Sequence, residues 1–176
     1  YAMLKKQGLI NELWVMGCYS EKRGESIRID IPEVDRIYGN FNWNEILKVL
    51  DAGSHVTHER TLTTPRHYAY LKISEGCNSP CSYCIKPVIN GPLTSYDMKD
   101  LVTEVQYLAG NGVKEIQLVA QNLTAYGQDI YGQKRIAELV NRIADVKGIE
   151  WIRLHYAYPI GFPLELLDTI RQRENV

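Results

Sequence analysis

Three cysteines carry the clearest chemical signal in this sequence of 176 residues. Cys77, Cys81 and Cys84 follow a C-x3-C-x2-C spacing and come directly after residues 68–73, a strand-like segment. Cysteine thiolates are the usual ligands of iron–sulfur clusters. Three thiolates without an obvious fourth would leave one iron of a 4Fe–4S cluster open to another ligand. The spacing therefore favours a 4Fe–4S cluster with one open iron.

Two other uses of these thiols compete with the cluster. Disulfides are disfavoured because the three cysteines are close together, odd in number, and lie in a sequence without marks of secretion. Structural zinc is the main alternative, since Cys18 or a histidine could complete a tetrahedral site. Zinc sites usually combine two pairs of closely spaced ligands, each pair separated by two residues, and this sequence contains one such pair. The zinc alternative stays open at this point.

The segment that follows residue 66 predicts repeated βα units. Near-continuous apolar runs predict strands, and apolar residues at helical spacing predict the helices between them. Such repeats favour a parallel sheet with right-handed crossovers, so the fold class is α/β. The predicted strands span residues 68–73, 115–120 and 150–155; the predicted helices span 99–109, the region from 136 to 143, and a region that opens at Pro163.

Polar residues follow the predicted strands at the ends where parallel sheets collect their chemistry. The cysteine loop follows the first strand, Gln121 and Asn122 follow the second, and His155 ends the third. Three strand ends with polar groups predict one active site. Gln121 and Asn122 could also serve an ordinary turn, and His155 could be a half-buried histidine with its hydrogen bonds satisfied.

The N-terminal part predicts a separate, smaller α/β region. Residues 12–16 predict a short strand that delivers Cys18 to its C-terminal end. A Ser-, Thr- and His-rich stretch without periodicity then predicts a linker. The predicted division is residues 1–51 for the first region, 52–65 for the linker and 66–176 for the βα units.

Composition predicts a cytoplasmic globular protein. The sequence is 45% hydrophobic and 23% charged, as is ordinary for a globular chain. Its apolar runs fall short of the roughly 20 residues that a membrane-spanning helix needs, so no membrane association is expected. The net charge of −1 gives no electrostatic basis for direct nucleic-acid binding by this segment.

Three sequence stretches resemble a known family. Residues 75–84, EGCNSPCSYC, resemble the signature of radical S-adenosylmethionine (radical SAM) enzymes, in which an aromatic residue precedes the third cysteine. Residues 119–127, VAQNLTAYG, and 151–159, WIRLHYAYP, resemble segments of the methylthiotransferases. The HYAYP wording within residues 151–159 is more similar to the branch that modifies an aspartate of a small-subunit ribosomal protein than to the branch that modifies tRNA, which stays the alternative.

The resemblance implies a cofactor set and roles for single residues. Cys77, Cys81 and Cys84 would hold the radical SAM 4Fe–4S cluster, and Cys18 would be a ligand of a second 4Fe–4S cluster. S-adenosylmethionine would bind the open iron, with Tyr83 beside its adenine. Gln121, Asn122 and His155 are further candidates for cofactor contacts, and no catalytic residue is assigned.

The resemblance also implies partners and an architecture. The methylthio group would go to the β-carbon of an aspartate, and a flavodoxin or ferredoxin would supply electrons. Residues 1–51 would be the C-terminal portion of the family's N-terminal domain, and 66–176 the first half of a partial (βα) barrel. The rest of the N-terminal domain, the rest of the barrel and a C-terminal domain would lie outside this segment. The segment is therefore expected to be inactive alone.

Overall fold

The computed structural model describes residues 1–40, 42–50 and 60–176. Its described part divides into two compact units. The first contains the described residues up to Leu50 together with Cys81–Asn90, and the second contains those from Arg60 to Pro80 together with Gly91–Val176. The predicted boundaries at 51 and 65 stay predictions, and most of the predicted linker lies outside the described residues.

The first unit is built on a pair of parallel strands. Trp14 pairs with Arg36, and Met16 with Tyr38. Ile27, Val34 and Tyr38 are buried within this unit. The helix that begins at Cys18 follows the first strand directly, so the predicted delivery of Cys18 to the strand end is confirmed. The elements of this unit are β1 (Trp14–Met16), β2 (Arg36–Tyr38), α1 (Ala2–Lys6), α2 (Cys18–Arg23), η1 (Gly24–Ser26), α3 (Ile27–Asp30), α4 (Trp43–Val49) and α5 (Lys86–Asn90).

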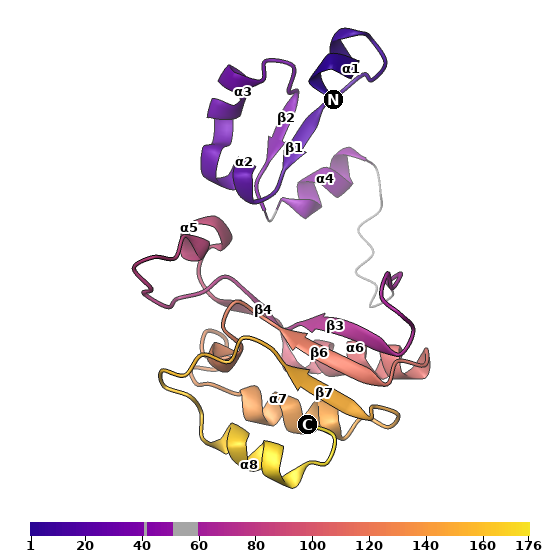
Figure 1. The fold of residues 1–176 in the computed structure, drawn as a ribbon, viewed down its shortest axis with the longest axis vertical. Coiled ribbons are helices and arrows are strands. Elements are labelled where there is room, and N and C mark those ends of the chain that lie inside the picture. The colour runs from indigo at the N-terminus through magenta and orange to yellow at the C-terminus, as the bar shows by residue number, and fades with distance from the viewer. Residues whose placement is uncertain (41, 51–59) are drawn as a thin grey trace. The chain divides into compact units, whose positions relative to one another are not determined.

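The second unit is a parallel three-stranded sheet in the order β3-β6-β7 (Figure 1). Helices lie between successive strands, as the βα pattern predicts, and the α/β class is confirmed. A short antiparallel pair, β4 with β5, adds to this unit. Its elements are β3 (Tyr68–Lys72), β4 (Ser74–Glu75), β5 (Thr94–Ser95), α6 (Met98–Gly110), β6 (Glu115–Val119), η2 (Leu123–Ala125), α7 (Ile136–Ala144), β7 (Trp151–Leu154) and α8 (Glu165–Gln172).

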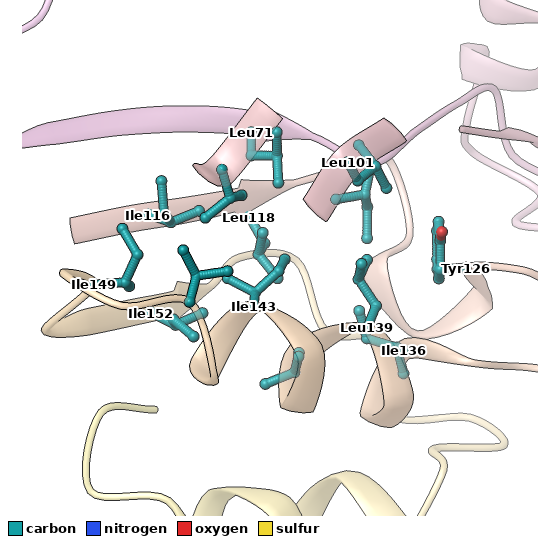
Figure 2. Packing of buried hydrophobic residues seen from close by; sticks show 14 of the residues in the cluster. Leu71, Leu101, Ile116, Leu118, Tyr126, Ile136, Leu139, Ile143, Ile149 and Ile152 are labelled. Carbon is teal, nitrogen blue, oxygen red and sulfur yellow. The ribbon is translucent and has the colours of Figure 1, made fainter. Parts of the chain in front are cut away.

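One face of this sheet forms the core. Leu71, Ile116, Leu118 and Ile152 are buried on it, and Figure 2 shows them packed together with side chains of α6 and α7. Fully burying a side chain of this size contributes about 1.5–3 kcal/mol. Alternate residues of β6 are only half-buried, so this strand buries one face fully and the other in part.

The helix α6 shows how local sequence places its element. The Asp97 side chain accepts a hydrogen bond from Lys99 N at 2.8 Å, which caps the helix start. Leu101, Val105 and Leu108 recur at helical spacing, and all three are buried. Among the described helices, none combines the length and the apolar character that a membrane crossing requires.

Candidate functional site

The cysteine loop leaves and re-enters the second unit through the β4–β5 pair. Ser74 pairs with Ser95 and Glu75 with Thr94, so the two ends of the loop are fixed side by side. Gly76 has a φ of +63°, and a Cβ there would overlap the carbonyl of Pro92. Only glycine meets both conditions without strain. The tight closure of the loop therefore depends on Gly76.

None of the four cysteines, all of which the structure describes, forms a disulfide. Cys77, Cys81 and Cys84 are half-buried, and Cys18 is exposed. Cys77 lies at the base of the loop, where its N–H donates to Gly91 O at 3.2 Å and its sulfur accepts from Ser79 N at 3.4 Å. Sulfur that accepts backbone N–H groups is a common feature of cluster ligands. The chemistry of this donor set thus fits an iron–sulfur cluster.

The structure does not bring the described thiols together as the ligands of one metal site. Cys77 belongs to the second unit, whereas Cys81 and Cys84 belong to the first. Within residues 1–40, 42–50 and 60–176, no group of three or more Cys, His, Asp or Glu side chains is arranged to hold a metal ion. The assignment of these cysteines as cluster ligands therefore stays a prediction.

Asn122 connects the end of β6 to the cysteine loop. Its Nδ2 donates to Ser79 Oγ at 3.2 Å, and its Oδ1 accepts from Thr124 Oγ1 at 2.8 Å. Asn122 is 8% exposed and Thr124 is fully buried. The amide is thus engaged on both sides by groups of the chain itself. In this structure Asn122 is a buried tether, and its contact with a cofactor stays a prediction.

The segment after β7 is bonded to the segment after β6. Leu123 N donates to Tyr156 O at 3.3 Å. The single hydrogen of the Thr124 hydroxyl, which points to Asn122 Oδ1, has Tyr158 O at 3.3 Å as a second, longer acceptor. Tyr156 has a φ of +61°, a conformation that non-glycine residues rarely adopt. Three strand ends therefore meet in a bonded group within the second unit: the start of the cysteine loop, residues 121–124 and residues 155–158.

The remaining predicted site residues differ in their surroundings. His155 is half-buried and extends the β6–β7 ladder, since its N–H donates to Leu118 O at 3.2 Å. Gln121 is half-buried beside Asn122. Tyr83 is 88% exposed in the first unit. Cys18 opens α2, with its sulfur 3.8 Å from an amide oxygen. Their roles toward a cofactor stay predictions.

Sequence reasoning missed a carboxylate clamp on the exit of the cysteine loop. Asp129 accepts from the Ser95 hydroxyl and from Ser95 N, each at 2.6 Å. Partial desolvation raises the pKa of Asp129, but the hydrogen bonds from Ser95 and from the backbone of residues 129 and 130 together outweigh this effect and hold the pKa below its ordinary value. Ser95 Oγ also accepts from Gly127 N at 3.0 Å. The two partners are 34 residues apart, so no local pattern could have predicted the pair.

Tyr126 is completely buried. Its hydroxyl donates to Tyr96 O at 2.9 Å, which ties the segment after β6 to the segment after β5. Burial raises its pKa far above the ordinary tyrosine value, so the hydroxyl stays protonated and keeps its role as a donor.

Comparison with known proteins gives a consistent set of relatives. No protein-family model matches the chain. Curated proteins named ribosomal protein uS12 methylthiotransferase RimO match nearly all of it. The one from Porphyromonas gingivalis is 54% identical over 174 residues, 98% of this chain and 40% of its own length. Those from Bacteroides thetaiotaomicron and Flavobacterium johnsoniae are 51% and 46% identical over alignments of 178 positions, which cover the whole of this chain and 41% of their own lengths.

Solved structures give a weaker likeness. The radical S-adenosylmethionine methyltransferase TsrM from Kitasatospora setae, with cobalamin and a [4Fe-4S] cluster bound, has a TM-score of 0.38 and 14% identity, and the match covers 62% of this chain and 29% of that one. The chain spans about 40% of the length of the curated relatives that it matches. Over nearly all its residues the chain is similar to these RimO proteins, as its radical SAM and methylthiotransferase motifs predict.

Proposed function

We propose that this chain is part of an enzyme that transfers a methylthio group to the β-carbon of an aspartate in ribosomal protein uS12. The enzyme would use S-adenosylmethionine and two 4Fe–4S clusters. The observation that carries the proposal is the loop with three cysteines, none in a disulfide, that β4 and β5 close in a chain 54% identical to a curated RimO.

The residues have separate tasks in this proposal. Cys77, Cys81 and Cys84 would hold the radical SAM cluster, and Cys18 would bind the second. A bound cluster with S-adenosylmethionine supplies one electron that breaks a carbon–sulfur bond of the cofactor. Cys77 is fixed by the loop base, and the tether from Asn122 to Ser79 holds the loop on the sheet end. A loop held in place in this way would keep water and unintended C–H groups away from a reactive intermediate.

Three further residues would contact S-adenosylmethionine. Tyr83 exposes nearly all of its ring, which leaves its face open to stack on an adenine. Gln121 and His155 follow neighbouring parallel strands, at the edge of the sheet where α/β proteins bind their ligands. A flavodoxin or ferredoxin as electron donor, and a cytoplasmic place of action beside ribosomes, complete the proposal.

Electron paramagnetic resonance tests the cofactor part. The full-length protein is reconstituted anaerobically, reduced, and measured with and without S-adenosylmethionine. We expect a reduced-cluster signal that shifts when S-adenosylmethionine is added, because the open iron gains a ligand. Iron content should exceed that of one 4Fe–4S cluster, and Cys18→Ala should lower it. A colourless protein with stoichiometric zinc would instead identify a non-catalytic zinc-stabilised module.

Mass spectrometry of the product tests the substrate part. Purified uS12 and tRNA are each incubated with the reduced protein and S-adenosylmethionine, and then digested. A methylthio mass increase on one aspartate of uS12 is the expected result. The same modification on tRNA alone would assign the chain to the tRNA branch of the family.

A further inference from the structure

The face of the sheet opposite the core carries a row of connected polar side chains. Glu115 and Gln117 project from β6, and Arg153 and His155 lie on the neighbouring β7 segment. Alternation along parallel strands places all four on the face away from Ile116 and the rest of the core. This face takes no part in the described core, so packing of the core does not explain the contacts among these polar side chains.

The row begins with a fixed negative charge. Arg153 Nε donates to Glu115 Oε1 at 2.6 Å. The hydrogen bond from Arg153 holds the pKa of Glu115 below its ordinary value, and a second hydrogen bond from Gln117 acts in the same direction. Glu115 is therefore ionised at neutral pH, and an ionised carboxylate only accepts hydrogen bonds.

The charge on Glu115 decides how the amide of Gln117 is turned. Gln117 must present its NH₂ group to the carboxylate, and its Nε2 donates to Glu115 Oε1 at 2.9 Å. Its carbonyl oxygen consequently faces His155, with Oε1 3.2 Å from His155 Nε2. A carbonyl oxygen can only accept, so His155 Nε2 must carry a hydrogen.

We propose that Gln117 is a positioning residue that holds His155 as its Nε2–H tautomer. Nδ1 then presents a lone pair at the end of β7. The ligand class for such an acceptor is a group with an O–H or N–H donor. Under the proposed function, on which this identification rests, the donor is a hydroxyl or ammonium group of S-adenosylmethionine. The tautomer itself follows from the contacts of Glu115, Gln117 and His155 alone.

Nitrogen-15 spectroscopy tests the tautomer without any ligand. Full-length protein is labelled with ¹⁵N-histidine, kept with its clusters oxidised, and measured about two pH units above the ordinary histidine pKa of about 6.5. The His155 signals are assigned by their loss in His155→Gln. We expect the protonated-nitrogen shift at Nε2 and the lone-pair shift at Nδ1.

Variants show whether Gln117 sets this state. In Gln117→Met the two His155 shifts should move toward those of a free histidine, which exchanges between tautomers. Glu115→Gln should do the same, because a neutral amide no longer fixes the direction of Gln117. Gln128→Met, at an exposed glutamine on another loop, is the matched control and should change nothing. A protonated Nδ1, or shifts unaffected by Gln117→Met, would overturn the proposal.

A double-mutant cycle tests the action through His155. Affinity for S-adenosylmethionine is measured by equilibrium dialysis on the reconstituted protein. Gln117→Met should weaken binding about fivefold, the worth of one hydrogen bond, and should have no further effect in a His155→Ala background. Equal losses in both backgrounds would refute positioning through His155. If unaltered protein fails to bind S-adenosylmethionine, the proposed function fails, while the tautomer is still decided by the spectra.

Discussion

Replacement of Asn122 by alanine separates two roles that the sequence left open for this residue. The change removes the hydrogen bond to Ser79 at 3.2 Å and the one from Thr124 at 2.8 Å. Each neutral hydrogen bond contributes about 1 kcal/mol. Thr124 keeps Tyr158 O as an acceptor at 3.3 Å, so no further cost arises from an unpaired hydroxyl. We therefore expect a loss of about 2 kcal/mol in the free energy of unfolding.

Urea unfolding followed by circular dichroism measures this loss. With a typical dependence of about 2 kcal/mol per molar urea, the midpoint should fall by about 1 M. Gln121→Ala is the matched control, since it removes the neighbouring amide from a half-buried position, and its midpoint should stay within about 0.3 M. An Asn122→Ala midpoint equal to that of the control, together with weaker S-adenosylmethionine binding, would refute the tether and support a direct cofactor contact.

Three further replacements test the loop closure. Gly76→Ala should lower the free energy of unfolding by at least about 2 kcal/mol and reduce iron retention, because the new Cβ meets the carbonyl of Pro92 at a positive φ. Gly110→Ala, at a site with open space, is the control. Equal iron content in the two variants would contradict the expectation. Asp129 is exposed and has a lowered pKa, so it should contribute about 0.5–1 kcal/mol to the free energy of unfolding above about pH 4. This contribution should vanish as the pH falls through the folded pKa of Asp129. The difference in stability between unaltered protein and Asp129→Asn should therefore close in acid, and a difference that stays constant with pH would contradict this. Tyr126→Phe should lose about 1 kcal/mol, since it removes one buried hydrogen bond, and an unchanged thermal midpoint would count against that bond.

The strands and helices of the second unit were predictable because their signals are local. Apolar residues at helical spacing fixed the positions of α6 and α7, and the apolar runs fixed β3, β6 and β7 to within one or two residues. Parallel order then followed from the alternation of strands and helices. Each of these signals is carried by residues that lie within about 15 positions of one another.

Short elements escaped prediction. The β4–β5 pair has two residues in each strand, and α5 has five residues. Two residues cannot display a period, and a single helical turn has no resolvable apolar face. These elements exist because long-range pairing holds them, as in the antiparallel contact of Ser74 with Ser95.

Local sequence was enough to predict a chemistry, from the thiol spacing, the aromatic residue before Cys84 and the polar groups at strand ends. Which of those groups touch could be learned only from the folded chain. It turned Asn122 inward as a tether, added the Asp129 clamp, and set Gln117 beside His155 through the register of β6 with β7. The physical reason is that hydrogen-bond partners 34, 38 and 43 residues apart meet only when strand register and the burial of the core bring their backbones together.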